Sequence, residues 1–247
     1  MDGFFLLNKE KGITSNQLVQ NIKKSLKFKK VGHLGTLDPM ATGLMVIAAN
    51  RATKFSSYFL ESDKSYHATV KLGCSTDTDD ALGKIIETSD NLPTEEHTHK
   101  VLNSFVGQSL QLAPFYSALK HKGKPLYKYA REGDFILKPP REINVFSIKD
   151  FNFDHDECSF LIHCSKGTYI RSIARDIGKK LGCGAHLSGL KRVSQGKFNI
   201  NQALNTEEVE IKNLISIEEA FKAFSNIKLQ NDQLKIFLNG GKLKNIN

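Results

Sequence analysis

A single acidic side chain, Asp38, lies within a long basic stretch of the sequence. Between Glu10 and Glu61 there are eight Lys or Arg residues and no acid other than Asp38. Nearby positive charge favours the charged form of a carboxyl group, so we expect Asp38 to be ionised. An ionised carboxylate can act as a nucleophile or as a base. The Asp-Pro pair at 38–39 is also typical of a turn, so a purely structural role is the local alternative.

The residues just before Asp38 favour a role in ligand binding. Gly32 and Gly35 lie on either side of His33, which precedes the acid by five positions. Glycine has no Cβ atom, so the backbone at these two positions can approach a ligand closely. Together with the lone acid, this composition indicates a loop that contributes to a functional site.

A second basic stretch contains the other candidate charge, Arg171. Between Glu157 and Glu207 there are again eight Lys or Arg residues and a single acid, Asp176. Arg171 falls in the first turn of a predicted helix, where the helix dipole disfavours a cation. An ion pair with a carboxylate such as Asp38 would hold it there, and a solvated side chain is the alternative. The two basic stretches likewise form either a phosphate-binding surface or solvated helix faces.

The composition is that of a folded globular protein with excess positive charge. The chain has 247 residues, a formal net charge of +9, 40% hydrophobic residues and 25% charged residues. The longest apolar run, 44–49, is far shorter than the roughly 20 residues that a membrane helix needs. The first residues also do not resemble a signal peptide. We therefore expect a cytoplasmic protein that binds a polyanion and no membrane.

The cysteines and acids do not form a recognised metal-binding pattern. The four cysteines include no Cys-x-x-Cys pair, and the segment 77–80 lacks the glycine and glutamate of a calcium-binding loop. A zinc site made by Cys158, Cys164, Cys183 and His186 stays open as a minor alternative, despite its irregular spacing. No dinucleotide-binding or phosphate-binding glycine motif occurs. We expect neither a metal nor a cofactor.

Residue patterns predict the strands and helices that would position these groups. Strict alternation indicates a half-buried strand at 66–72, and the apolar run at 44–49 indicates a strand buried on both faces. Further strands are predicted at 4–7 and 159–164. Thr14 and Gln17 have the spacing of a capping box at the start of a helix. A second helix is predicted to begin at 93–94 and end at Gly107, and a third to be capped by Thr168.

These elements do not alternate with the regular spacing of a parallel doubly wound sheet. We predict an α+β fold with a large mixed, mainly antiparallel sheet flanked by helices and loops. The residues from about 225 onward are polar and rich in asparagine, which indicates a tail or a small appended element.

Several distinctive motifs follow one another along the chain. They are NKEKGITS at 8–15, GHLGTLDPMATGLM at 32–45, YHATVKLG at 66–73, YSALK at 116–120, CSKGTYIR at 164–171 and LGCGAHL at 181–187. In this order they resemble the motifs of a known enzyme family, the bacterial tRNA pseudouridine-55 synthases of the TruB family, and the resemblance extends over most of the chain. It implies a pseudouridine synthase fold for residues 1–224 and, for residues 225–247, a short remnant of the family's C-terminal RNA-binding domain of the PUA type.

The resemblance implies isomerisation of uridine to pseudouridine in the T-loop of tRNA, at position 55. This reaction is redox-neutral and needs no cofactor. The resemblance assigns the nucleophile or base to Asp38, an ion pair with that carboxylate to Arg171, and stacking on a flipped-out uracil to Tyr66. Supporting roles in the site are implied for Tyr169, Leu190, His33 and Lys9. Contacts with RNA are expected for Lys27, Lys29, Lys30, Lys120, Arg131, Lys166, Lys191 and Arg192.

Two departures from the family pattern are visible. Ala113 stands where the family commonly has proline, and the C-terminal segment is too short for a complete PUA domain.

Two other functions are alternatives to tRNA modification. The first is a non-catalytic RNA-binding protein or chaperone, which would not need a lone acid in a basic cleft. Guide-RNA-directed modification of ribosomal RNA would depend on a full PUA domain and on protein partners. A tRNA-modifying enzyme of this family would need only the T-arm of tRNA as its partner. We therefore expect no protein partner and a monomer.

Overall fold

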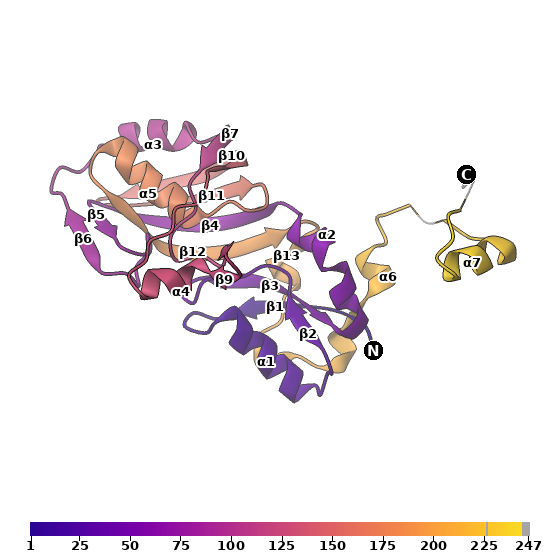
Figure 1. Ribbon diagram of the computed structural model, residues 1–247. Coiled ribbons are helices and arrows are strands. Elements are labelled where there is room, and N and C mark those ends of the chain that lie inside the picture. Colours follow the sequence, from indigo (N-terminus) through magenta and orange to yellow (C-terminus); the bar gives the residue numbers. More distant parts are fainter. Residues whose placement is uncertain (226, 244–247) are drawn as a thin grey trace.

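A computed structural model describes residues 1–225 and 227–243 of the chain, and its centre is one ten-stranded sheet (Figure 1). The strands follow the order β14-β1-β3-β12-β4-β11-β10-β7, with β13 paired to β12 and β2 paired to β3. Neighbouring strands are antiparallel except for β3 and β12, which run parallel over a short contact. The mixed, mainly antiparallel sheet predicted from the sequence is therefore confirmed. The strands are β1 (Gly3–Lys9), β2 (Val31–His33), β3 (Thr42–Ala49), β4 (Lys64–Leu72), β7 (Gly107–Gln111), β10 (Arg141–Asp154), β11 (Glu157–Cys164), β12 (Ala185–Gln195), β13 (Phe198–Asn199) and β14 (Ile215–Ser216).

Helices cover the sheet, and two small hairpins lie beside it. Helices α3 and α5 lie together over the half of the sheet that contains β4, β11 and β10, whereas α1 lies beside β1 and β2 (Figure 1). The hairpins are β5–β6 (Cys74–Thr76 and Ile85–Thr88) and β8–β9 (Lys120–His121 and Lys124–Pro125). The helices are α1 (Ser15–Ser25), α2 (Ser56–Leu60), α3 (Glu95–Asn103), α4 (Leu126–Arg131), α5 (Ile170–Leu181), α6 (Ile217–Ala220) and α7 (Asn231–Leu238).

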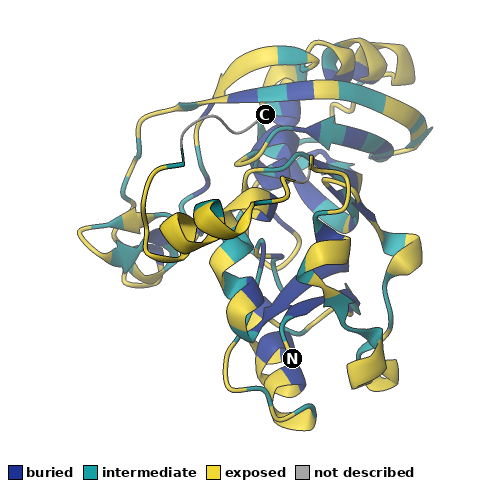
Figure 2. Cartoon of the chain, turned by 90° about the vertical axis from the view of Figure 1, so that its right-hand side faces the viewer, coloured by how far each residue is buried: buried dark blue, intermediate teal, exposed yellow. Residues whose placement is uncertain are grey.

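Strands β1 and β3 are buried on both faces, because separate hydrophobic clusters cover the two sides of the sheet there. Phe5 and Leu7 belong to the larger cluster, which α1 and α5 help to form. Phe4 and Leu6, which point the other way, belong to the smaller cluster. Figure 2 shows these central strands buried and the outer helices exposed on their solvent sides. The two-faced burial explains the continuous apolar run at 44–49.

The predicted alternation of β4 and the capping box of α1 are both confirmed. Residues of β4 are buried at every second position, with Tyr66 on the face that packs against α5. At the start of α1, the Thr14 hydroxyl accepts a hydrogen bond from the Gln17 amide at 3.1 Å. The Gln17 side chain in turn accepts one from the Thr14 amide at 2.7 Å. This capping box fixes the point where the chain turns from β1 into the helix.

Two predicted helix boundaries were wrong. Helix α3 is capped by Thr94 as expected, but it ends at Asn103 rather than at Gly107, whose positive φ of 109° instead begins β7. Helix α5 is capped by Tyr169 rather than by Thr168. The Thr168 hydroxyl donates to the Ser165 carbonyl at 2.9 Å, so it does not cap the helix.

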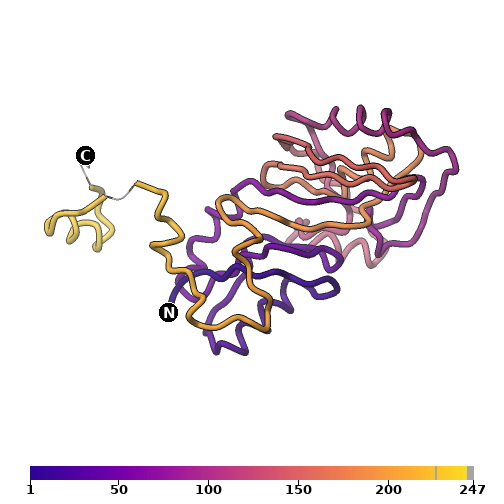
Figure 3. Tube along the Cα trace, turned by 180° about the vertical axis from the view of Figure 1, so that it is seen from behind, coloured from indigo at the N-terminus to yellow at the C-terminus, as the bar shows by residue number. Residues whose placement is uncertain are grey.

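The C-terminal segment leaves the sheet beside α2. Phe221 packs against Phe4, Phe55 and Phe59, with ring centroids 5.2–6.5 Å apart, and so anchors the residues around α6. Helix α7 lies apart from the body and buries none of its side chains (Figure 3). Residue 226 and residues 244–247 of the expected tail lie outside the described part of the chain. No helix among the described residues is long and apolar enough to cross a membrane.

Candidate active site

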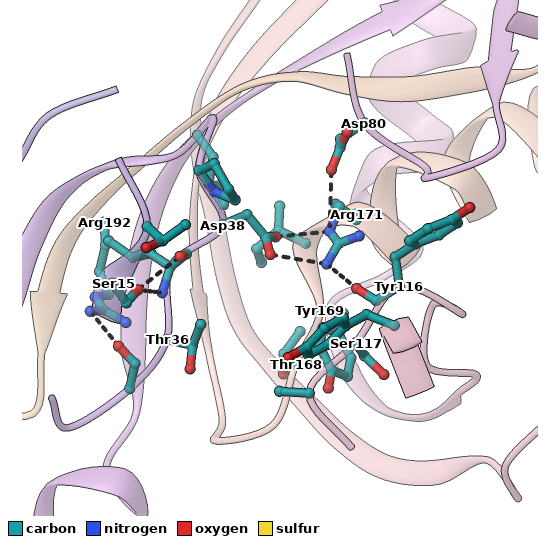
Figure 4. A pocket seen from close by; sticks show the side chains of 18 of the residues that line it. Ser15, Thr36, Asp38, Asp80, Tyr116, Ser117, Thr168, Tyr169, Arg171 and Arg192 are labelled. Atoms are coloured by element: carbon teal, nitrogen blue, oxygen red, sulfur yellow. Dashed lines mark hydrogen bonds and ion pairs between the residues drawn. The ribbon is translucent and has the colours of Figure 1, made fainter. Parts of the chain in front are cut away.

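A pocket of about 810 Å³ opens where β3 and β12 run parallel, and most of the expected site residues line it (Figure 4). The start of α1, the loop at 33–39, strand β4, the segment after β7 and the start of α5 form its walls. The fold therefore brings together residues that are more than 100 positions apart. The sequence-predicted residues in its lining are His33, Asp38, Tyr66, Arg131, Tyr169, Arg171, Leu190 and Arg192.

Asp38 and Arg171 form an ion pair with two contacts. Arg171 Nε lies 2.8 Å from Asp38 Oδ2, and Arg171 Nη2 donates to Asp38 Oδ1 at 3.1 Å. The guanidinium also donates to the carbonyls of Thr78 and Tyr116, at 3.1 and 2.9 Å. Only 5% of the Arg171 side chain is exposed, so the ion-paired alternative holds and the solvated one does not. Two contacts fix the orientation of the carboxylate as well as its charge.

A second carboxylate, Asp80, approaches the same guanidinium. Its Oδ2 lies 3.7 Å from Arg171 Nε, and its Oδ1 accepts hydrogen bonds from the Thr78 hydroxyl at 2.8 Å and the Leu82 amide at 3.0 Å. The sequence analysis did not identify Asp80 as part of this site. Nothing local separates Asp80 from Asp77 and Asp79, because only the tertiary fold brings Arg171 to it.

The pKa of Asp38 is raised above its ordinary value, even though cations surround the carboxyl group. Burial at the base of the pocket disfavours the charged form and is the largest effect, although 32% of the side chain still contacts solvent. The Arg171 guanidinium opposes this rise, and the Asp80 carboxylate adds to it. Asp38 therefore depends on Arg171 to keep its carboxylate ionised.

Buried polar side chains hold the loop that carries Asp38. The Ser15 hydroxyl both donates to the Leu37 carbonyl and accepts from the Leu37 amide, each at 2.9 Å. Lys9 has no exposed surface, and its ammonium donates to the carbonyls of Pro39 at 3.4 Å and Ala41 at 2.7 Å. Burial lowers the pKa of Lys9 to about 8. Lys9 was expected to support the site and does so through the backbone, whereas Ser15 was not identified from the sequence.

Arg192, which was expected to contact RNA, is buried and bonded to the backbone around the pocket. Its side chain is 1% exposed, and it donates to the carbonyls of Leu44 at 2.6 Å and Gly35 at 3.1 Å. These bonds tie the loop at 33–39 to β3. At Gly43 a Cβ atom would lie 2.3 Å from the Arg192 carbonyl oxygen, so glycine is required where β3 and β12 meet.

Tyr66, Leu190 and His33 complete the pocket wall around Asp38. Tyr66 is 7% exposed, and burial raises the pKa of its hydroxyl to about 12. It therefore stays neutral at neutral pH and offers the pocket an aromatic face. Leu190 is half-buried on β12 and lines the same pocket. Burial and the nearby Arg192 charge lower the pKa of His33, so the imidazole is neutral.

The remaining basic residues expected to contact RNA are all exposed. Lys166 forms an ion pair with Glu61, and the Arg131 guanidinium lies 5.4 Å from the centre of the Tyr127 ring. The four cysteines are free, and within residues 1–225 and 227–243 no three His, Cys, Asp or Glu side chains gather around a potential metal site. The zinc alternative therefore has no geometric support. The exposed basic residues are Lys27, Lys29, Lys30, Lys120, Arg131, Lys166 and Lys191.

Two family models match the chain in succession. Residues 23–170 match the N-terminal domain of the TruB family pseudouridylate synthases, and residues 171–226 match the tRNA pseudouridylate synthase B C-terminal domain. A tRNA pseudouridine synthase B from Francisella philomiragia is 46% identical over 90% of this chain and 76% of its own length. The protein of the same name from Methylobacillus flagellatus is 42% identical over 97% of this chain and 82% of its own length.

Solved structures of pseudouridine synthase complexes have a similar fold. A Cbf5-Nop10-Gar1 complex matches with a TM-score of 0.65 and 29% identity, over 83% of this chain and 53% of that chain. An H/ACA RNP bound to a substrate RNA containing 2'-deoxyuridine matches with a TM-score of 0.63 and 28% identity, over 83% and 51%. The chain thus spans about half the length of these structural relatives, and the expected pseudouridine synthase fold is confirmed. The chain belongs to the TruB family of pseudouridylate synthases, which are isomerases that act on RNA.

Proposed function

We propose that this protein converts uridine to pseudouridine at position 55 in the T-loop of tRNA, with Asp38 as the nucleophile or base. The Asp38–Arg171 ion pair at the base of the pocket is the observation that carries this proposal. Its two contacts hold one carboxylate at a fixed position in a pocket whose volume suits a nucleotide. The relatives named tRNA pseudouridine synthase B support tRNA as the substrate.

The reaction breaks the N1–C1′ bond of uridine, turns the base and joins C5 to C1′. The hydrogen on C5 leaves as a proton and N1 gains one, so the product is an isomer of the substrate. Asp38 can take part by attacking the ribose or the ring, or by removing the C2′ proton to give a glycal. In each case the carboxylate must be ionised and aimed, and Arg171 provides both conditions.

The target base must leave the loop before Asp38 can reach its ribose. Extruding a nucleotide costs a few kcal/mol, which stacking and phosphate contacts in the pocket offset. Tyr66 lies in the pocket wall with its ring available to the uracil, and its high pKa favours stacking over proton transfer. Leu190 lines the same pocket and supplies an apolar contact. His33, neutral and on the loop beside Asp38, is placed to fill the space that the base vacates.

The exposed basic side chains supply electrostatic attraction for the tRNA backbone. Lys27, Lys29 and Lys30 follow α1, whose first residues line the pocket, and Lys120 lies on the hairpin next to α4. Such contacts act mainly through phosphates and weaken as salt concentration rises. We assign the catalytic unit to residues 1–224 acting as a monomer, because the pocket is formed within this segment of one chain.

Release of tritium from tRNA labelled at uridine C5 tests the proposal, because C5 loses its hydrogen only when it becomes the glycosidic carbon. The wild type should release tritium, and Asp38→Asn should slow release by about 100-fold or more while binding tRNA normally. Asp154→Asn, at an exposed position on β10, is the matched control and should behave as the wild type. Replacing uridine 55 by cytidine should abolish release.

Three outcomes would contradict the proposal. Equal release by Asp38→Asn would refute the role of the carboxylate, and release from the tRNA lacking uridine 55 would refute the target position. Tight, salt-dependent binding of tRNA with no release by the wild type would instead identify a non-catalytic RNA-binding protein.

A further inference from the structure

Buried polar atoms without a hydrogen-bond partner are concentrated at the pocket. Apart from Arg171, whose Nε is ion-paired with Asp38, five described residues have such a side-chain nitrogen or oxygen, and three of the five line the pocket. An unsatisfied buried donor or acceptor is costly, so a cluster of them indicates groups that acquire a partner when a ligand binds. The three residues are His33, Ser117 and Arg141.

Arg141 is the member of this group whose charge has no counterpart among residues 1–225 and 227–243. Both its Nε and its Nη2 are buried without a hydrogen-bond partner, and no acidic side chain of the described chain lies within ion-pair distance. Nearby cations differ in this respect, because Arg171 pairs with Asp38 and Lys166 pairs with Glu61. A guanidinium cannot lose its proton in a protein, so Arg141 stays charged.

The surroundings hold the Arg141 guanidinium at the pocket wall. It is the first residue of β10, and its guanidinium carbon lies 4.4 Å from the centre of the Tyr169 ring, which lines the same pocket. Stacking of this kind retains a cation without using its N–H groups. At Gly167 a Cβ atom would lie 3.4 Å from Arg141 Nη1, so this side of the guanidinium is bordered by bare backbone. No group of the described chain therefore accepts a hydrogen bond from this guanidinium.

The chemistry of the group identifies that ligand. A planar guanidinium with several free donors matches a carboxylate or a phosphate. If the substrate is RNA, as proposed above, its phosphodiesters are the only anions that it offers. A nucleotide that enters this pocket has one phosphate on each side. We propose that Arg141 binds one of the two phosphates that flank the target uridine.

This contact would position the nucleotide while its base is detached. Once the N1–C1′ bond breaks, the uracil must turn, and the ribose must stay in front of Asp38. A phosphate held at the wall formed by Gly167, Thr168 and Tyr169 fixes the backbone on the side where α5 begins. Arg141 is thus a substrate-binding residue distinct from the Asp38–Arg171 pair.

Binding measurements with a charge-deleted variant and neutralised RNA test this proposal. Arg141→Met keeps an unbranched side chain over Tyr169 without the charge, and Lys149→Met removes an exposed cation from the same strand as a control. We expect Arg141→Met to weaken tRNA binding by about 10- to 100-fold. The slope of log K against log salt should fall by about 0.7 to 0.9, whereas Arg141→Lys should keep the slope.

A neutral methylphosphonate placed in turn at each phosphate flanking the target uridine identifies the contact. The wild type should lose affinity at one of these two positions, and Arg141→Met should lose no more at that position. Equal sensitivity of the two proteins at both positions, or an unchanged salt slope in Arg141→Met, would overturn the proposal. These results come from binding alone, so they are separate from a failure of the wild type to release tritium, which would instead refute the proposed activity.

Discussion

Replacing Arg171 by methionine should shift the pH dependence of the reaction upward and lower its maximum rate. Asp38 must be ionised, and burial already raises its pKa above the ordinary value, with Arg171 as the main opposing influence. Removing the guanidinium leaves burial and the Asp80 charge unopposed except by Lys9. A carboxyl group beside an arginine typically has its pKa lowered by about 1–3 units. Because 32% of the Asp38 side chain is exposed to solvent, water screens part of this attraction, so the pKa of Asp38 should rise by less in the variant than it would for a fully buried pair.

The sign of the effect follows from the ionisation that the reaction needs. A higher pKa means that a smaller fraction of Asp38 is charged at a given acidic pH, so the acid limb of the rate profile moves to higher pH. The rate at the plateau should also fall, because the two contacts that orient the carboxylate are lost. Arg171→Lys keeps a charge but cannot make both contacts, so it should shift the limb less.

Single-turnover tritium release, measured between pH 5 and pH 9, provides the assay. Arg175→Met is the control, because Arg175 lies on the same helix but pairs with Asp79 and Asp176 outside the pocket. Arg171→Met also leaves the carbonyls of Thr78 and Tyr116 without a donor, so its thermal unfolding must be checked at each pH. An acid limb that stays in place, or moves to lower pH, in a folded Arg171→Met protein would refute this account of Asp38.

Three further predictions concern the loop that carries Asp38. Ser15→Ala loses both hydrogen bonds to the Leu37 backbone, so the free energy of unfolding should fall by about 1–3 kcal/mol. Single-turnover tritium release should also slow, and an unchanged rate would show that these bonds do not position the loop. Gly43→Ala should lower the free energy of unfolding more than Gly12→Ala in chemical denaturation. Both glycines have a positive φ, but only at Gly43 would the new Cβ lie 2.3 Å from a backbone oxygen, that of Arg192. Equal losses of stability in the two variants would contradict the close packing at Gly43. Lys9→Met should be less stable than the wild type at pH 7, because buried carbonyls lose their donor. Lys9 loses its proton at a pKa of about 8 in the folded wild type and of 10.5 in the unfolded chain. The stability of the wild type relative to Lys9→Met, measured by urea titration, should therefore rise between these two pH values, by at most about 3 kcal/mol. A fall over the same range would contradict the lowered pKa.

Local sequence patterns predicted strands and helix starts correctly where a single requirement, such as one buried sheet face or paired backbone amides, determines the residue types. The alternation of β4 reflects a sheet face that packs on α5, and the capping box of α1 satisfies backbone amides within four residues. Helix ends were less predictable, because competing local bonds decide them. Thr168 has the side chain of a cap, yet its hydroxyl donates to a nearby carbonyl, and the Gln111 side chain accepts from the Tyr169 amide at 2.8 Å instead.

The site was predictable for residues whose local context was unusual and not for the others. Asp38 stands out because it is the only acid in a basic stretch. Ser15 and Asp80 do not stand out, because each acts through one tertiary contact that no spacing indicates. The pKa of Asp38 could not be inferred from neighbouring charges in the sequence, since burial by the folded pocket has the larger effect.

The charges around the pocket explain why one loop can hold a functional carboxylate. Lys9, Arg171 and Arg192 are buried cations around Asp38 and Asp80, so positive groups outnumber the acids there. Lys9 satisfies the backbone carbonyls of Pro39 and Ala41, and Arg192 satisfies that of Gly35, in a segment that has no regular secondary structure to do so. The charge of Lys9 also favours the ionised form of Asp38. A substrate with phosphates on both sides of its target base would balance this excess, so the cations that build the loop also favour entry of RNA.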